Sequence, residues 1–177
     1  MKPTQKLHQA GQSLWLDNIT RDLLTDGTLR SYIDDLGITG LTSNPTIFDH
    51  AFRNSESYDG AIRAGAEGGL AAEEIFFRLA IEDLQGAADN FRPVWDRTNG
   101  IDGWVSLEVS PRLARDPDST LGAAVDLSGR ADRPNLFIKI PGTPGGLGAI
   151  EEAIFAGVPL NVTLLFSRAQ YLAAADA

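Results

Sequence analysis

Five polar residues stand near the C-terminal ends of five short apolar segments: Asp17, Asn44, Glu108, Lys139 and Thr163. Alternate side chains of a strand point to opposite faces, so the phase of each residue predicts its face. Lys139 alternates with Ile138 and Ile140, and Glu108 alternates with Leu107. The aliphatic phase is expected to face a layer of helices. The polar phase is then expected to converge at one end of a sheet.

An amine among two carboxylates, an amide and a hydroxyl can act as a nucleophile. Burial of Lys139 in an apolar strand favours its neutral form, whereas a nearby carboxylate opposes that shift. A neutral amine attacks a carbonyl group and yields an iminium, the electron sink for breaking a carbon–carbon bond. Asp17 or Glu108 would then move protons, while Asn44 and Thr163 orient hydroxyls or water.

Each of these residues also has a purely structural interpretation. A single lysine flanked by aliphatic residues more often forms an ion pair with a carboxylate than a Schiff base. Asp17 and Glu108 are more often caps or ion-pair partners than acids, Asn44 before a proline is more often a helix cap, and Thr163 is ordinary in a strand. The enzymatic interpretation is favoured because five such groups occupy equivalent positions.

The elements that must position these residues follow from the hydrophobic pattern. The apolar segments have strand length and alternate with helical patterns, which indicates βα units. The predicted strands are residues 13–17, 38–43, 104–109, 135–140 and 159–165. Parallel strands with helical crossovers form either an open doubly wound sheet or a barrel.

Four helices are predicted between or after these strands. Residues 72–82 have one apolar face and form the first predicted helix. The second is capped by Asp118 or Ser119 and ends near Gly129. Its apolar side consists of Leu121, Ala124 and Val125. A third starts at residues 143–144 and runs through 150 and 154 to 157, and a fourth is capped by Ser167. Residues 54–67 and 83–97 show no pattern that assigns them.

Composition excludes several classes of function. The 177 residues, 43% hydrophobic, are ordinary for a single globular domain covering residues 1–177. A net charge of −9, with 15 basic residues scattered among 24 acids, argues against nucleic-acid or membrane binding. The absence of cysteine excludes disulfides and a thiolate nucleophile. The N-terminal segment does not resemble a signal peptide, so a cytoplasmic location is expected.

Two further features carry little weight. Residues 142–146 (GTPGG) precede a predicted helix, but they match neither a P-loop nor a dinucleotide fingerprint, so a flexible turn is the better explanation. His8 and His50 stand alone without metal-ligand spacing and are interpreted as surface or packing residues. No metal site and no organic cofactor are predicted.

The five candidate residues lie within segments that resemble the successive motifs of bacterial transaldolases, and in particular the actinobacterial branch. These segments are residues 16–24 (LDNITRDLL), 40–48 (GLTSNPTIF), 105–111 (VSLEVSP), 133–143 (RPNLFIKIPGT) and 161–167 (NVTLLFS). The resemblance runs essentially from end to end. It implies a TIM (β/α)8-type barrel of which the chain holds about five βα units.

The resemblance also implies an activity and a role for each residue. Transaldolases move a dihydroxyacetone unit between sugar phosphates of the pentose phosphate pathway, without a cofactor. Lys139 would form the Schiff base, Asp17 would act as acid–base group, Glu108 and Thr163 would handle the catalytic water, and Asn44 would bind donor hydroxyls. The implied substrates are sedoheptulose 7-phosphate, fructose 6-phosphate, erythrose 4-phosphate and glyceraldehyde 3-phosphate.

Two departures from the family pattern leave alternatives open. Residues 144–146 (PGG) replace the acidic residue and glycine that often follow the lysine strand. A barrel of this type needs eight units and about 250 residues. The phosphate-binding arginine and serine are therefore expected beyond residue 177, supplied by missing C-terminal strands. The alternatives are an inactive fragment that self-associates through open strand edges, or a class I aldolase that releases dihydroxyacetone.

Overall fold

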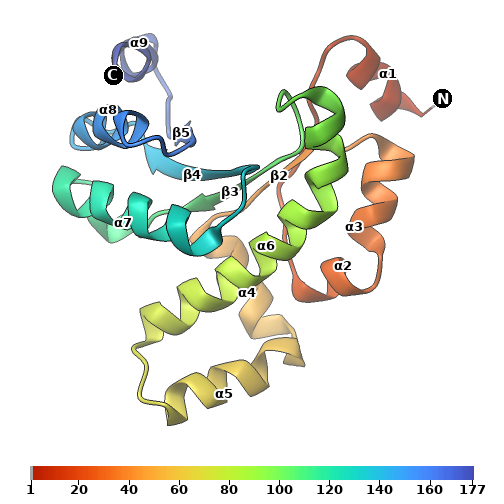
Figure 1. Cartoon of the computed structure of the whole chain (residues 1–177), viewed down its shortest axis with the longest axis horizontal. Coiled ribbons are helices and arrows are strands. Elements are labelled where there is room, and N and C mark those ends of the chain that lie inside the picture. Colours follow the sequence, from red (N-terminus) through yellow and green to blue (C-terminus); the bar gives the residue numbers. More distant parts are fainter. Residues whose placement is uncertain (1) are drawn as a thin grey trace. The chain divides into compact units, whose positions relative to one another are not determined.

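A computed structural model describes residues 2–177 and shows a parallel five-stranded sheet with α-helical connections (Figure 1). The strands are β1 (Trp15–Leu16), β2 (Gly40–Thr42), β3 (Trp104–Glu108), β4 (Leu136–Pro141) and β5 (Leu160–Thr163). Their order in the sheet is β1-β2-β3-β4-β5. A doubly wound sheet reverses its strand order at a switch point, whereas a barrel keeps sequential neighbours side by side. The predicted fold class, a TIM (β/α)8-type barrel with five of its βα units, is confirmed.

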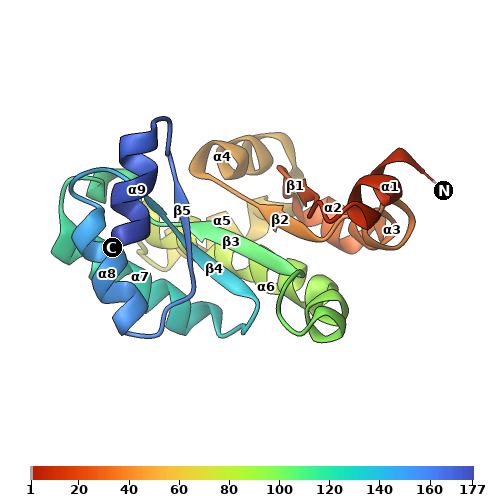
Figure 2. The same ribbon diagram turned by 90° about the horizontal axis from the view of Figure 1, so that it is seen from above.

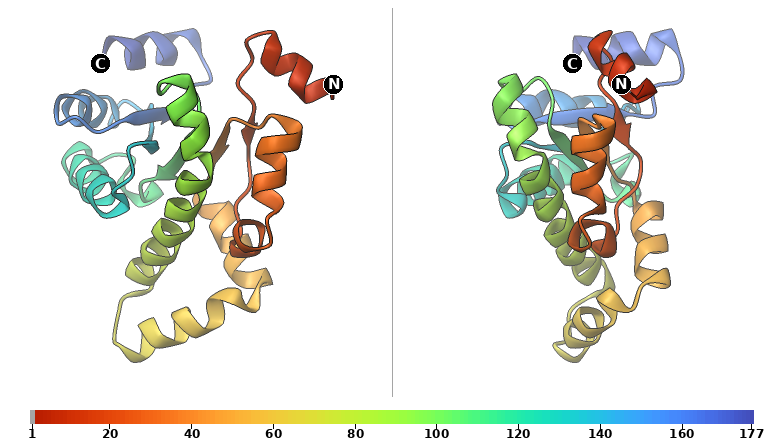
Figure 3. Two further views of the ribbon diagram at one scale, coloured as in Figure 1. Left: turned by 45° about the vertical axis from the view of Figure 1, so that its right-hand side comes forward. Right: turned by 90° about the vertical axis from the view of Figure 1, so that its right-hand side faces the viewer.

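The chain divides into two compact units, Met1–Val105 and Ser106–Ala177. The first unit contains β1, β2 and the start of β3. Its helices are α1 (Pro3–Gln9), α2 (Arg21–Thr25), α3 (Thr28–Ser31), a π-helix η1 (Tyr32–Leu36), α4 (Pro45–Asn54), a 3-10 helix η2 (Glu56–Tyr58), α5 (Asp59–Glu67) and α6 (Ala72–Thr98). Figure 3 shows α5 folding back beside α6, against which it packs.

Residues 83–97, for which the sequence pattern assigns no element, belong to helix α6. It has 27 residues and continues through Pro93, which lacks the amide needed for a helical hydrogen bond. The helix persists because an apolar face spaced by three or four residues stays buried on both sides of the proline, at Leu84, Ala87, Ala88, Phe91 and Val94. Burial of this face against the rest of the protein therefore outweighs the helix-breaking effect of Pro93.

The second unit contains the rest of β3, β4 and β5. Its helices are a 3-10 turn η3 (Pro111–Leu113), α7 (Pro117–Ala131), α8 (Leu147–Phe155) and α9 (Arg168–Asp176). Helix α7 packs on β4 and on α8, and Figure 2 shows β4 and β5 side by side. Ser167 caps α9 by accepting the amide hydrogen of Gln170, as predicted.

The predicted alternation of aliphatic and polar side chains is confirmed in β3 and β4. The aliphatic phase of β3 and β4 is at most 2% exposed, at Val105, Leu107, Val109, Leu136, Ile138 and Ile140. In the opposite phase lie Ser106 and Lys139, which are also buried, and Glu108, which is partly buried. A strand buried on both faces is what a barrel wall requires.

Several local predictions were wrong in their detail. Helix α7 is capped by Asp116, whose carboxylate accepts the Ser119 amide at 3.0 Å, so the predicted caps Asp118 and Ser119 lie inside the first turn. Val125 is 46% exposed and does not belong to the buried face. Helix α8 starts at Leu147 because the Thr143 hydroxyl accepts the Gly146 amide and holds the preceding residues in a turn.

Strand β5 ends earlier than predicted. Leu164 has φ of 62°, in the left-handed region that a leucine rarely adopts, and it is 47% exposed. The alternation that the sequence suggested therefore stops at Thr163. No helix within the described part of the chain has the length and apolarity needed to cross a membrane.

Candidate active site

Lys139 and Glu108 form an ion pair in the second unit. Lys139 Nζ lies 3.1 Å from Glu108 Oε2, and the two side chains are only 9% and 15% exposed. The amide of Val109 donates to the carbonyl oxygen of Lys139 at 3.1 Å, which keeps the adjacent ends of β3 and β4 in register. The structural interpretation of Lys139 as an ion-pair partner is therefore observed. It leaves the catalytic interpretation open, because the same two groups are an amine of the kind that attacks carbonyls and a carboxylate of the kind that moves protons.

The register of β4 and β5 places two further polar residues along the Lys139 strand. Lys139 is the partner of Asn161, and Pro141 is the partner of Thr163. In parallel strands, partnered residues point to the same face, so Asn161 lies beside Lys139 and Thr163 one step closer to the strand ends. Asn161 was not among the predicted site residues. It shares the phase of Thr163 two residues earlier, and that phase was the available signal.

The ends of β4 and β5 are packed closely around a glycine. The Gly142 amide donates to Thr163 oxygen at 2.8 Å. A Cβ atom at position 142 would stand 2.4 Å from Leu165 Cδ2, so any larger residue would have to displace the end of that side chain. The left-handed turn at Leu164 precedes Leu165 directly. Thr163 is thus held at the strand end by its neighbours on both sides.

A hydroxyl connects the two loops that follow Glu108 and Lys139. Thr143 Oγ1 donates to Ala114 oxygen at 2.8 Å and accepts the Gly146 amide at 3.1 Å. Gly145 packs on the backbone of Arg115, because a Cβ atom there would lie 3.0 Å from Arg115 Cα. The GTPGG segment is a packed turn in which specific glycines are required by close neighbours.

The other two predicted residues, Asp17 and Asn44, belong to the first unit. Asp17 directly follows β1 and is exposed. Asn44 follows β2 and caps α4, since its Oδ1 accepts the amide of Ile47 at 2.9 Å. The predicted cap role of Asn44 is observed, and its amide nitrogen remains available for another partner.

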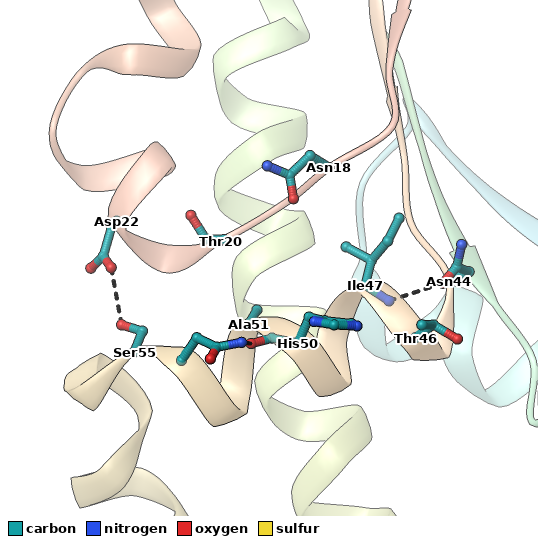
Figure 4. Close-up of a pocket in the computed structure, with 10 residues that line it drawn as sticks. Asn18, Thr20, Asp22, Asn44, Thr46, Ile47, His50, Ala51 and Ser55 are labelled. Carbon is teal, nitrogen blue, oxygen red and sulfur yellow. Dashed lines mark hydrogen bonds between the residues drawn. The ribbon is translucent and has the colours of Figure 1, made fainter.

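Asn44 also lines a cavity of about 420 Å³ in the first unit. Figure 4 shows that the cavity lies between the segment after β1 and helix α4. It is open to solvent and most of its accessible lining is contributed by carbon atoms, although most of the residues that line it are of polar types: Asn18, Thr20, Asp22, Asn44, Thr46, Ile47, His50, Ala51, Asn54 and Ser55. Asp17 is not among these residues, although its neighbour Asn18 is.

A buried polar network holds one wall of this cavity. The Arg21 amide donates to the Tyr58 hydroxyl, and that hydroxyl donates to Asp83 Oδ2, both at 2.7 Å. The Arg21 guanidinium donates to Asp83 Oδ1 at 2.8 Å and to Glu82 Oε2 at 3.0 Å. Tyr58 and Asp83 are 0% and 2% exposed. The segment that follows Asp17 is therefore tied firmly to α6.

The network changes the titration of its members. Burial raises the pKa of the Tyr58 phenol, and the charge of Asp83 adds to the rise. Burial also raises the pKa of Asp83, against the hydrogen bonds from Tyr58 and Arg21. Burial lowers the pKa of Arg21, but its bonds to Asp83 and Glu82 outweigh that effect and the net change is upward.

Among residues 2–177, no three His, Asp or Glu side chains come together in a group that could hold a metal ion. The fold and the buried lysine define the class: a (β/α)-barrel protein with an interior Lys–Glu pair near the carboxyl ends of two adjacent strands. Residues 14–177 match the Transaldolase/Fructose-6-phosphate aldolase family, and the chain belongs to that family. The predicted family is confirmed.

Relatives named transaldolase align with almost the whole chain. The transaldolase of Thermobifida fusca is 47% identical over 175 residues, which is 99% of this chain and 48% of the relative. That of Kocuria rhizophila is 44% identical, with 96% and 46% covered. That of Trichodesmium erythraeum is 42% identical, with 94% and 44% covered. The chain thus spans about half the length of the curated relatives it matches.

Proposed function

We propose that the protein carrying this chain is a transaldolase that transfers a dihydroxyacetone unit between sugar phosphates through a Schiff base on Lys139. The observation that supports this most directly is the Lys139–Glu108 pair, with 3.1 Å between charged atoms and little exposure of either side chain. A buried lysine with a carboxylate beside it supplies the nucleophile of a Schiff base and a group that can move protons while the Schiff base forms. The family match supplies the reaction class.

The proposed reaction starts when Lys139 Nζ attacks the C2 carbonyl carbon of a ketose phosphate. Loss of water leaves an iminium, which accepts the electron pair of the C3–C4 bond as that bond breaks. Asp17 takes the proton of the C4 hydroxyl, and an aldose phosphate leaves. The remaining enamine attacks the aldehyde carbon of a second aldose phosphate, and hydrolysis then frees the amine.

Glu108 and Thr163 would position and deprotonate the water of that hydrolysis, and Asn44 would bind donor hydroxyls. Asn161 joins this set on the strength of its register with Lys139. Asp17 and Asn44 directly follow β1 and β2, and residues at the carboxyl ends of strands are the ones that form barrel active sites.

The direct experiment is borohydride trapping with fructose 6-phosphate. It should be run on the 177-residue chain and on a chimera that joins the chain to the second half of the Thermobifida fusca relative. Peptide mass spectrometry of the chimera should show the reduced sugar adduct on Lys139. An adduct on another lysine, or no adduct in a folded chimera, would contradict the proposal.

A second candidate is an aldolase that releases free dihydroxyacetone, which the family description also covers. The two reactions differ only in the fate of the enamine, which adds to an aldehyde in a transaldolase and takes up a proton in an aldolase. Product analysis with and without erythrose 4-phosphate separates them. A transaldolase produces new ketose phosphate only when the acceptor is present, whereas an aldolase releases dihydroxyacetone without it.

We further propose that residues 1–177 are the N-terminal portion of a single barrel domain acting in the cytoplasmic pentose phosphate pathway. Residues that bind the substrate phosphate would lie in a segment equivalent to the second half of the relatives. The isolated chain should therefore turn over negligibly while the chimera is active. A fragment that functions only by self-association would instead form defined oligomers in light scattering, and the chimera would be inactive.

A further inference from the structure

The turn between α6 and β3, in the first unit, contains the pair Asn99–Gly100, the only place in the chain where glycine follows asparagine. Figure 1 shows α6 leading into this turn. The backbone nitrogen of the next residue can attack an asparagine side chain, and glycine hinders that attack least because it has no side chain of its own. Asn99 is exposed, so water and base reach its amide. The pair therefore has the composition and the access that deamidation requires.

The fold engages the nitrogen that would attack. The Gly100 amide donates to the carbonyl oxygen of Trp95 at 2.9 Å, and the Asn99 amide donates to that of Asp96 at 3.3 Å. Asn99 has φ of 53° and ψ of 44°, a left-handed conformation that asparagine adopts more readily than most residues. Together these features form a Schellman cap at the end of α6. An amide that donates such a bond is held in place and gives up its proton slowly, as in protection from hydrogen exchange, so it is a poor nucleophile.

Three contacts hold the cap closed. The Thr98 hydroxyl accepts the Asp102 amide at 3.0 Å and donates to the preceding turn of the helix at 2.9 Å. The rings of Trp95 and Trp104 pack edge to face, with their centroids 6.3 Å apart. A Cβ atom at Gly103 would overlap the backbone of Trp95, so the chain passes directly over the helix end. Opening of the cap must loosen these contacts, which makes it a local unfolding event.

We propose that Asn99 is a latent deamidation site, which the Schellman cap of α6 keeps closed and which reacts when the cap opens. In the open state the Gly100 nitrogen loses its proton to hydroxide and attacks the carbonyl carbon of the Asn99 side chain. The bond from that carbon to the amide nitrogen breaks, and the nitrogen leaves as ammonia with a proton from water. Water then opens the resulting cyclic succinimide and leaves aspartate or isoaspartate. The modification is independent of the proposed catalytic activity.

Both products weaken the cap that delayed their formation. Isoaspartate lengthens the main chain between the two amides by one methylene group, so they no longer fit their two carbonyl partners together. Aspartate places a negative charge at the C-terminal end of α6, where the helix dipole disfavours it. The cap therefore opens more easily after the reaction than before it. Deamidation at Asn99 would progressively loosen the connection between α6 and β3.

The test compares deamidation in the folded and the unfolded chain. The 177-residue chain is incubated at mildly alkaline pH with and without urea, and peptide mass spectrometry follows the conversion of each asparagine. In urea Asn99 should convert first, ahead of the matched control Asn54, which also lies at a helix end but precedes a serine. In the folded chain Asn99 should convert more slowly by about tenfold or more. Equal rates with and without urea, or earlier conversion of Asn54 in urea, would overturn the proposal.

Variants test the cap directly. Thr98→Val removes the hydroxyl that holds the turn and should speed the conversion of Asn99 by about fivefold in the folded chain, with no change in urea. Asn99→Gly keeps a left-handed cap but removes the reactive amide. Its midpoint of thermal unfolding should stay constant during incubation, while that of the unmodified chain falls. An unaltered folded-state rate in Thr98→Val, or an equal fall of the midpoint in Asn99→Gly, would contradict the proposal.

Discussion

Each compact unit buries an ion pair, and the two pairs differ in which cation they contain. In the first unit Arg21 meets Asp83, which also accepts the hydroxyl hydrogen of Tyr58. In the second unit Lys139 meets Glu108 at 3.1 Å. A guanidinium stays protonated under all ordinary conditions, whereas the amine of a lysine is a nucleophile once it has lost its proton. The arginine pair therefore stabilises the fold, and the proposed function assigns the reaction to the lysine pair.

The neighbours of the two pairs reinforce the difference. Arg21 is held by two carboxylates and by contact with the Tyr58 ring, 4.9 Å from its centroid. Lys139 instead is the register partner of Asn161, and Thr163 stands two residues further along β5. Burial of an ion pair does not by itself indicate function. In the proposed function, the type of cation and the position near a strand end distinguish the two pairs.

The most demanding test exchanges the cations. Lys139→Arg keeps a positive charge beside Glu108 but removes the nucleophile, so borohydride trapping on residue 139 should vanish and turnover of the chimera should fall by about 10³-fold or more. The matched change Arg21→Lys should retain most turnover and lower stability by about 1–2 kcal/mol. Comparable loss of turnover in both variants would remove the distinction between the pairs.

Removal of the Tyr58 hydroxyl should produce the next largest effect. Tyr58→Phe leaves a buried Asp83 oxygen and the Arg21 amide without their partner, which should cost about 2 kcal/mol in urea unfolding near neutral pH. Tyr171→Phe is the control, because that side chain is 61% exposed.

The same variant tests the pKa of Tyr58. Because burial raises the folded-state pKa above the unfolded value of about 10, the contribution of the phenol to stability is complete below that pH. It is lost as the pH rises toward the folded-state pKa. Unfolding measured from pH 8 to 11 should show a steeper alkaline decline for the unmodified chain than for Tyr58→Phe, and parallel declines would argue against the network.

The loop contact of Thr143 should have a smaller effect that is confined to the lysine pair. Thr143→Val removes the hydroxyl that joins the loops after Glu108 and Lys139, at an expected cost of about 1 kcal/mol. Thr143→Ser keeps the hydroxyl. If the contact positions the pair, the valine variant of the chimera should lower kcat several-fold more than the serine variant, with KM little changed. Equal kcat values would assign Thr143 a structural role alone.

The smallest effect is expected away from both pairs, at the cap of α7. The hydrogen bond from the Ser119 side chain, followed by that from its amide, lowers the pKa of Asp116. Its contribution is therefore present above the unfolded pKa of about 3.9 and lost as the pH falls through the folded value. Asp116→Asn keeps a cap but removes the titrating group, so its free energy of unfolding should fall less between about pH 5 and pH 2 than that of the unmodified chain. An equal fall in both would contradict this assignment.

Much of the fold was predictable because local patterns and burial agreed. The five strands appeared where apolar alternation indicated them, and Ser167 capped the helix that it was expected to cap. Helix α6 was only partly predictable, since Pro93 breaks the local pattern and only the buried face across it keeps the helix intact. The early end of β5 was not predictable, because nothing local favours a left-handed leucine at position 164.

Some features of the candidate site could likewise be predicted from the sequence, and others could not. Side-chain alternation put Lys139 and Glu108 on a common face because strand geometry has a period of two, whatever the rest of the chain does. Only tertiary structure could decide that their charged atoms meet at 3.1 Å, that Asn161 lies level with Lys139, and that Asn18, Thr46 and His50 line one cavity with Asn44. Distances between elements depend on register and packing, which arise from contacts between residues far apart in the chain.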